Sequence, residues 1–172
     1  MRQPRITFVG MYLILLLAQM VICNYFHLTY YVTLSLLPSL ILFLPSRIGT
    51  VGAMLIAAAT GLVVDALAEG LPGLNMFALV PVAFARRGIL SLVCGSELYA
   101  NGENLSMKKH GIGKVLTVLL IGQGLFLSLY IWADNAGTSP FWFSFLRFLC
   151  SLAAGVLLSL IAGDLLSDNS RD

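Results

Sequence analysis

Six apolar runs follow one another along the chain, separated by short polar stretches. A helix needs about 20 apolar residues to cross the hydrocarbon core of a bilayer. The second and fourth runs are shorter than this, and the other four reach it. The runs predict six membrane-spanning helices, at residues 6–26, 30–44, 49–68, 72–85, 112–133 and 141–166.

These runs are apolar on every side rather than at alternate positions, which favours α-helices over a membrane β-barrel. We therefore predict an all-α integral membrane protein, with six transmembrane helices in one bundle and a single polytopic domain over residues 1–172. The two short runs contain Pro38 and Pro81. Because proline inside a helix removes a backbone donor and clashes with the preceding turn, we expect both helices to be kinked.

Two adjacent arginines decide where the fourth helix ends. Extending it to Cys94 would place Arg86 and Arg87 at the centre of the bilayer, at a cost of about 2.5 to 3.5 kcal/mol each. If the helix ends at Ala85, both side chains can reach the interface. Residues 88–98 then form an interfacial helix or a short re-entrant piece, although they could also extend the fourth span.

The basic residues outside the runs all fall on one side of a six-span path. They are Arg2, Arg5, Arg47, Arg86, Arg87, Lys108, Lys109, Lys114 and Arg171. An excess of lysine and arginine marks the cytoplasmic side of a membrane protein. Both termini are therefore expected in the cytoplasm, and Arg86, Arg87, Lys108 and Lys109 are expected to anchor the cytoplasmic face.

Composition places nearly the whole chain in the bilayer. Hydrophobic residues make up 59% of the chain and charged residues 10%, whereas about 25% of residues are charged in an ordinary soluble domain. The first run is longer than the apolar core of a signal peptide, which has about 7 to 15 residues. We expect it to be retained as the first helix, and no stretch remains for a separate soluble domain.

Two of the runs carry a strip of small residues at every fourth position, and each strip includes one charged residue. These positions are Ala53, Ala57, Gly61 and Asp65 in the third run, and Arg147, Ser151, Gly155, Ser159 and Gly163 in the sixth. Strips of small residues let helix backbones approach closely. Asp65 is therefore expected to point into the bundle, because an ionised acid facing lipid is costly.

Depth suggests a partner for Asp65. With the third helix running outward and the sixth running inward, Asp65 and Arg147 both lie in the outer leaflet. Our hypothesis is an ion pair or water-bridged contact between them, which would hold the third helix against the sixth. A binding or proton-relay role for Asp65, or simple solvation at the interface, remains open.

The sequence does not favour catalysis. An intramembrane aspartyl protease needs two carboxylates in one site, but Asp164 and Asp65 are predicted in opposite leaflets. His27 and His110 have no serine partner at the same depth, as a serine hydrolase would require. The cysteines are far apart, with neither a Cys-x-x-Cys spacing nor a Cys/His cluster, so we predict no metal site. We also predict no cofactor and no nucleic-acid partner.

The stretch GLVVDALAEGLPGLNMFALVPVAFARRG resembles the rod shape-determining protein MreD family. In that family an apolar helix with a Gly-x-x-x-Asp step leads to a Pro/Gly turn and then to an apolar helix that ends in basic residues. The matching positions are Gly61, Asp65, Pro72, Gly73, Arg86 and Arg87. Many members have one more residue between the proline and the glycine of the turn. The motif covers about residues 49–90, and the chain length and six-span topology are also similar.

This resemblance implies a component of the bacterial cytoplasmic membrane that belongs to the machinery of cell elongation, which builds lateral peptidoglycan. The implied partners are an MreC-like single-span protein, an MreB-like filament, a RodA-type glycosyltransferase and its penicillin-binding transpeptidase. The family's fold is similar to the substrate-binding subunit of energy-coupling-factor vitamin transporters. No catalytic residues are known for the family.

Two functions follow as expectations. The first is a non-enzymatic membrane adaptor or scaffold that controls rod shape. The alternative is a solute-binding membrane subunit of a vitamin-type transporter, which needs an outward pocket with convergent polar groups. The outer half offers Asp65, Arg147, Asn75 and His27 for such a pocket.

Overall fold

The computed structural model describes residues 4–25, 33–69, 73–95, 105, 111–135 and 141–168. The regular secondary structure of these residues is helical throughout, without a strand. In chain order the elements are α1 (Pro4–Tyr25), α2 (Leu37–Leu42), α3 (Thr50–Val64), the π-helical turn η1 (Asp65–Glu69), α4 (Leu74–Cys94), α7 (Ile112–Asn135) and α8 (Phe141–Asp168). The prediction of an all-α chain is confirmed for the described residues.

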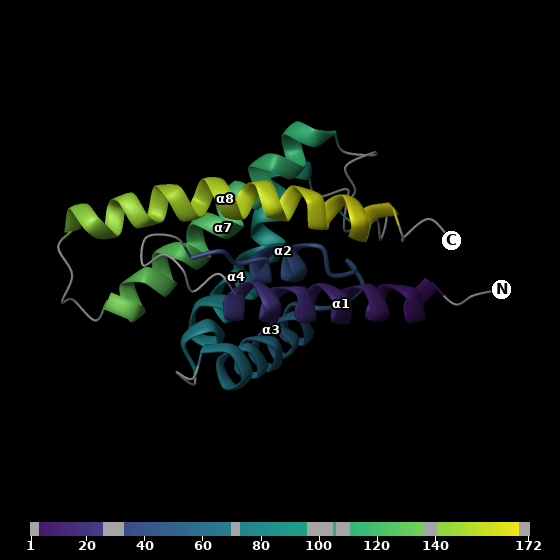
Figure 1. Ribbon diagram of the computed structural model, residues 1–172. Helices are drawn as coiled ribbons and strands as arrows, with labels where there is room; N and C mark the ends of the chain where they lie inside the picture. The colour runs from purple at the N-terminus through teal and green to yellow at the C-terminus, as the bar shows by residue number, and fades with distance from the viewer. Residues whose placement is uncertain are drawn as a thin grey trace.

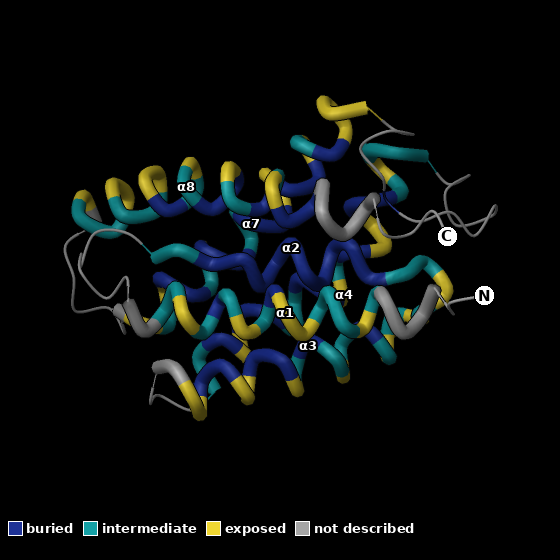
Figure 2. Tube along the Cα trace, turned by 45° about the vertical axis from the view of Figure 1, so that its right-hand side comes forward, coloured by how far each residue is buried: buried dark blue, intermediate teal, exposed yellow. Residues whose placement is uncertain are grey.

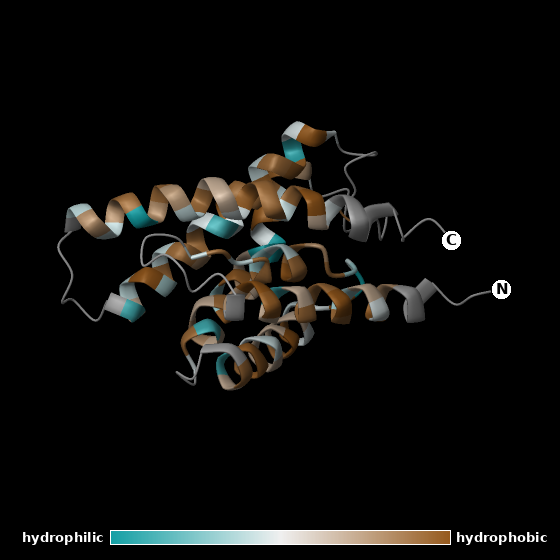
Figure 3. Cartoon of the chain, in the orientation of Figure 1, coloured by the Kyte–Doolittle hydropathy of each residue, from teal (hydrophilic) through white to brown (hydrophobic). Residues whose placement is uncertain are grey.

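Among the described residues, four helical stretches are long and apolar enough to cross a membrane. They are Thr50–Leu67, Leu74–Cys94, Ile112–Asp134 and Trp142–Gly163. A shorter apolar stretch, Phe8–Cys23, lies in α1. Brown, apolar turns dominate these helices, and teal polar turns are few (Figure 3). The chain therefore has the make-up of a multi-pass membrane protein.

The short helix α2 lies at the centre of the bundle and packs against α1, α3, α4, α7 and α8. All of its residues are buried, and Figure 2 shows the chain around it in dark blue while the outer helices alternate between buried and exposed turns. In Figure 1, α1 begins and α8 ends on the right, whereas α7 ends and α8 begins on the left. The helices thus cross the molecule in both directions around a buried centre.

The second predicted span differs from the structure. Of the part of this span that the structure describes, residues 33–44, Leu37–Leu42 form the helical stretch, and residues 33–36 have no regular structure. Pro38 lies in the first turn of α2 rather than in a helix interior. A proline is tolerated there because the first amides of a helix have no intrahelical partner. The predicted kink at Pro38 is therefore wrong, because the helix begins next to the proline instead of bending at it.

The end of the fourth helix was also predicted wrongly. Helix α4 does not stop at Ala85 but continues through Arg86 and Arg87 to Cys94, so that residues 88–94 extend it. Arg86 is buried, and its guanidinium donates hydrogen bonds to the backbone carbonyls of α2 and the residues after it. A charged group inside a bundle is tolerated when it is hydrogen-bonded. The prediction that the helix ends at Ala85 used the free-energy cost of an arginine that faces lipid. Arg86 is buried in the protein instead, so that cost does not apply to it.

The structure supports a direct test of the predicted topology at the two ends of α7. Gly113 is exposed near the first end, with open space around it, and Asn135 is the last residue. We expect a membrane-impermeant maleimide to label Asn135→Cys in intact cells but not Gly113→Cys, in a background in which the native cysteines are alanine. Both variants should be labelled after permeabilisation. Labelling of Gly113→Cys alone in intact cells would contradict the orientation.

Candidate functional site

Buried polar side chains show where this chain departs from a simple apolar bundle. A polar group buried without a partner costs free energy, and more so at membrane depth. The buried polar or charged residues are Gln19, Ser35, Ser39, Thr60, Asp65, Asn75, Arg86, Gln123, Ser151 and Ser159. Most of them gather at two places, the start of α4 and the non-helical chain around α2.

The first place is the start of α4, where Asp65 receives four hydrogen bonds. Its Oδ2 accepts from the backbone amides of Gly73, at 2.9 Å, and Met76, at 3.2 Å. Its Oδ1 accepts from both the backbone amide and the side-chain amide of Asn75, each at 2.9 Å. The first amides of a helix have no intrahelical acceptor, and the helix dipole favours a negative charge there. A carboxylate at the end of α3 therefore caps the helix that follows it.

Gly61 makes this capping contact possible. A Cβ on Gly61 would lie 2.6 Å from both the Cα and the amide nitrogen of Met76, closer than real Cβ contacts. The missing side chain lets the first turn of α4 lie directly against α3, one helical turn before Asp65. Gly73 has a φ of 101°, a left-handed conformation that favours glycine, and no side chain caps α4 from that position. The Gly-x-x-x-Asp step thus combines close packing with a cap supplied from the neighbouring helix. Pro72 lies outside the described residues.

The predicted pair between Asp65 and Arg147 is wrong. Arg147 donates from Nη1 to Asp134 Oδ2, at 2.6 Å, and from Nε and Nη2 to the hydroxyl of Thr33, at 3.2 and 3.0 Å. Helices α3 and α8 lie on opposite sides of α2 in Figures 1 and 2, and α3 packs chiefly against α4. The equal depth predicted for Asp65 and Arg147 therefore does not correspond to a contact between them. Asp134 could have been predicted as the partner, because α7 and α8 are joined by a short connection that brings their ends together.

The second place is the stretch of residues 33–44, which we call the central segment. Much of it is not helical, so its backbone groups need partners from elsewhere. Gln19 of α1 bonds it twice: its Oε1 accepts from the amide of Leu36, at 2.7 Å, and its Nε2 donates to the carbonyl of Leu34, at 3.1 Å. From α7, Gln123 donates to the carbonyl of Ser35, at 3.0 Å.

The two ends of the central segment are held by α8 and α4. At one end, the amide of Thr33 donates to the hydroxyl of Ser151, at 2.8 Å. At the other end, Arg86 donates from Nε to the carbonyl of Leu42, at 3.4 Å, and from Nη2 to the carbonyl of Leu44. Four helices thus supply hydrogen-bond partners to one buried strip of backbone.

The small residues of α8 serve this arrangement. Ser151, Gly155, Ser159 and Gly163 are buried, but they do not face α3 as the sequence suggested. A Cβ on Gly155 would lie 2.3 Å from Nε2 of Gln123, so the glycine leaves the space through which that side chain reaches the central segment. In α3, Ala53 and Ala57 are buried in the core, where α3 packs against α4.

Two buried side-chain oxygens, on α7 and α8, have no hydrogen-bond partner among the described residues. They are Oε1 of Gln123 and the hydroxyl of Ser159. Groups of this kind are where ordered water or a polar ligand binds. No cluster of three or more His, Cys, Asp or Glu side chains is found in the described part of the chain. Lys108 and Lys109, His27, His110 and the side chain of Asp164 lie outside it.

The new partner of Arg147 can be checked with two double-mutant cycles. We expect Arg147→Ala and Asp134→Ala to be coupled by about 0.5 to 1 kcal/mol, as is usual for partly exposed pairs and intramembrane polar contacts. Arg147→Ala and Asp65→Ala should be additive within about 0.5 kcal/mol, because the residues share no partner. Unfolding free energies in mild detergent measure both cycles. Coupling between Arg147 and Asp65, without coupling between Arg147 and Asp134, would support the ion pair predicted from the sequence.

Gln19 tests the role of the central segment. The change Gln19→Met keeps the shape of the side chain but leaves an amide and a carbonyl without partners, at about 1 to 3 kcal/mol each. We expect a clearly lower unfolding temperature in detergent. The control is Thr117→Val, which removes a hydroxyl that is exposed and bonds only its own helix. Equal stability of the two variants would mean that Gln19 does not hold the segment.

The contacts between α3 and α4 give a physical reason for the Gly-x-x-x-Asp step that resembles the MreD family. They do not assign the chain to a family. The chain matches no protein-family model, no curated protein and no solved structure.

Proposed function

We propose that this protein is a non-enzymatic membrane adaptor of the bacterial cell-elongation machinery, which controls rod shape during lateral peptidoglycan synthesis. The observation that carries the proposal is the role of Asp65 in the hairpin. Both of its oxygens are engaged by the start of α4, and the neighbouring Gly61 is fitted against the same turn. Gly61, Asp65 and Gly73, three of the residues that carry the resemblance to the MreD family, therefore hold α3 against the start of α4, which supports a scaffold rather than a proton relay.

The outer surfaces of the bundle support a role in assembly. Large apolar side chains are exposed on α1, α3 and α8 and would face lipid or the helix of a partner. Examples are Val9, Leu13, Leu17, Val51, Leu55, Leu157 and Ile161. The helix of an MreC-like single-span protein would lie against one of these faces. The MreB-like filament would lie near the cytoplasmic arginines, with the RodA-type glycosyltransferase and its transpeptidase in the same complex.

Localisation is part of the same proposal. We propose that the chain lies in the bacterial cytoplasmic membrane, with six spans and both termini in the cytoplasm. The central segment would serve as the second crossing, because it runs from Thr33, which is bonded to Arg147 near the start of α8, towards the opposite end of the bundle. A crossing that is largely non-helical is compatible with a membrane when it is buried in protein.

A solute-binding subunit is the second candidate. The observation in its favour is the pair of buried oxygens on Gln123 and Ser159 without partners among the described residues. The polar residues expected to line an outward pocket argue against it, since Asp65 is bonded to Asn75 and Arg147 to Asp134. These side chains are occupied by contacts that hold the fold.

Affinity purification from native membranes separates the two candidates. The tagged chain is extracted in mild detergent, and the folded peak from size-exclusion chromatography is analysed by mass spectrometry. We expect an MreC-like chain to co-purify. A tightly bound small molecule, with no chain of the elongation machinery, would favour the solute-binding subunit instead.

A matched pair of glycine variants ties the result to the hairpin. In Gly61→Ala the new Cβ would collide with the backbone of α4, at a cost of about 1 to 3 kcal/mol, so we expect the folded peak to retain less partner. Gly88→Ala also lies in a helix, but nothing is within 4 Å of the added Cβ, and its partner yield should equal that of the wild type. Full partner retention by the folded Gly61→Ala variant would contradict a role for the hairpin in assembly.

A further inference from the structure

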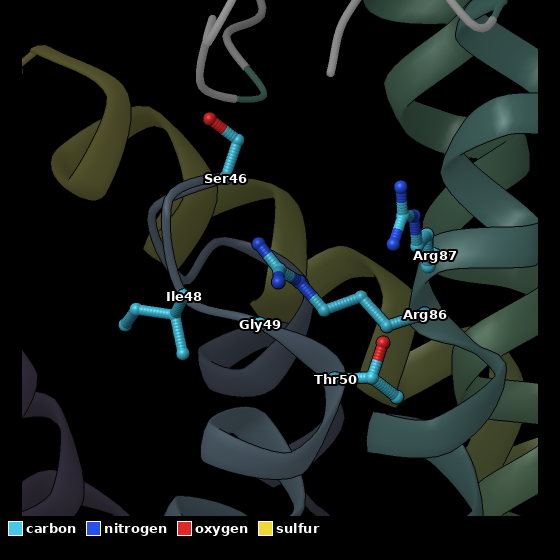
Figure 4. A pocket seen from close by; sticks show the side chains of 6 residues that line it. All are labelled: Ser46, Ile48, Gly49, Thr50, Arg86 and Arg87. Carbon is cyan, nitrogen blue, oxygen red and sulfur yellow. The ribbon is translucent and has the colours of Figure 1, made fainter. Parts of the chain in front are cut away.

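A small cavity lies between the start of α3 and the middle of α4. Its volume is about 220 Å³, and the lining residues are Ser46, Ile48, Gly49, Thr50, Arg86 and Arg87 (Figure 4). This lining includes two guanidinium groups and two hydroxyls, and none of the six residues is acidic. A cavity with this lining favours an anion.

The two arginines differ in how they are held. Arg86 is only 3% exposed, and its bonds to the carbonyls of Leu42 and Leu44 fix its position. Arg87 is exposed, and its guanidinium group lies at the other side of the cavity in Figure 4. A guanidinium stays charged at any physiological pH and has five N–H donors, so one buried and one exposed arginine can contact the same anion.

Helix α3 adds backbone donors to the cavity. It begins at Thr50, and its N-cap residue, Gly49, has no side chain to cap it. The amides of Thr50, Val51 and Gly52 belong to the first turn, where helical geometry provides no intrahelical acceptor. Together with the helix dipole, such amides attract phosphate groups. The arginines and the helix start therefore favour the same ligand from two directions.

The position of the cavity indicates where the ligand comes from. The central segment runs from Thr33, near the start of α8, to Leu44, and the cavity follows directly after it. The cavity thus lies at the end of the bundle where α8 ends, which is the cytoplasmic end by the distribution of basic residues. The cytoplasmic leaflet is rich in anionic lipids. At about 220 Å³ the cavity is smaller than a pocket for a drug-sized molecule, about 300 to 1,000 Å³, but it can take one phosphate group.

We propose that this cavity binds a phosphate group, supplied by the headgroup of an anionic phospholipid in the cytoplasmic leaflet. Arg86 and Arg87 contact the phosphate oxygens, the first amides of α3 complete the site, and the acyl chains stay in the bilayer beside Ile48. The proposal does not depend on the adaptor function.

Lipid retention by the purified protein tests the proposal. The protein in mild detergent is mixed with phosphatidylglycerol, with phosphatidylcholine or with inorganic phosphate, and bound ligand is measured by native mass spectrometry and by the unfolding temperature. We expect phosphatidylglycerol to bind and stabilise the wild type. Phosphatidylcholine has the same phosphate group, but Arg86 and Arg87 repel its trimethylammonium group, so we expect it to do neither. If inorganic phosphate stabilises the protein as strongly, the phosphate chemistry is supported and its source is a soluble compound.

Variants locate the site without disturbing the central segment. Arg87→Gln should weaken phosphatidylglycerol binding roughly tenfold, the loss expected for one charge-assisted hydrogen bond. Thr50→Val should weaken it less. Lys114→Gln removes an exposed cation near the same end of the bundle but outside the cavity lining, and it should leave binding unchanged. Equal binding of the two lipids by the wild type, or equal losses in Arg87→Gln and Lys114→Gln, would overturn the proposal.

Discussion

The need to satisfy the backbone of the central segment governs the arrangement of this bundle. A helix that crosses a membrane bonds its own amides and carbonyls, but residues 33–36 have no regular structure, and Ser35 and Leu36 are buried. Their partners are side chains on α1, α7 and α8, while Arg86 of α4 donates to the carbonyls of Leu42, at the end of α2, and Leu44, after it. Each of these helices therefore carries a polar residue at a fixed depth and a fixed rotation. Small residues such as Gly155 follow from the same need, because they make room for Gln123.

The cap on α4 applies the same constraint at a helix end. In water the first amides of a helix can bond to solvent, but within a bundle they need an acceptor from the protein. Asp65 supplies that acceptor from the preceding helix, and Gly61 permits the distance. Both buried sites thus use side chains of one helix to complete the backbone of another segment. The resembling sequence motif has a physical explanation at the level of this hairpin.

The sequence predicted those parts of the fold that depend on side-chain hydropathy. It did not predict those that depend on hydrogen bonds to the backbone. Hydropathy correctly predicted α1, α3, α7 and α8 to within a few residues, since those runs are long and their backbones are self-sufficient. It could not show that residues 33–36 are not helical, because Leu34 and Leu36 are apolar and the small hydroxyl residues Thr33 and Ser35 also occur in helical spans. Arg86 was predicted at the interface because an arginine at the centre of the bilayer is costly. Its partners are backbone carbonyls, which every residue has, so the sequence does not show which of them it bonds. The inward orientation of Asp65 followed from its spacing, but its partner depended on which helices are neighbours.

The hydrogen bonds of the central segment also have a consequence for the order of events during synthesis. Gln19 precedes this segment in the chain, but Gln123 and Ser151 are translated long after it. While α7 and α8 are still on the ribosome, the carbonyl of Ser35 and the amide of Thr33 lack the partners they have in the finished bundle. Until the last helix arrives, these two groups would need other partners, such as water or groups of the insertion machinery. A nascent chain arrested before α8 would keep that stretch accessible, so completion of the fold depends on the final 30 or so residues even though the segment itself lies in the first third of the chain.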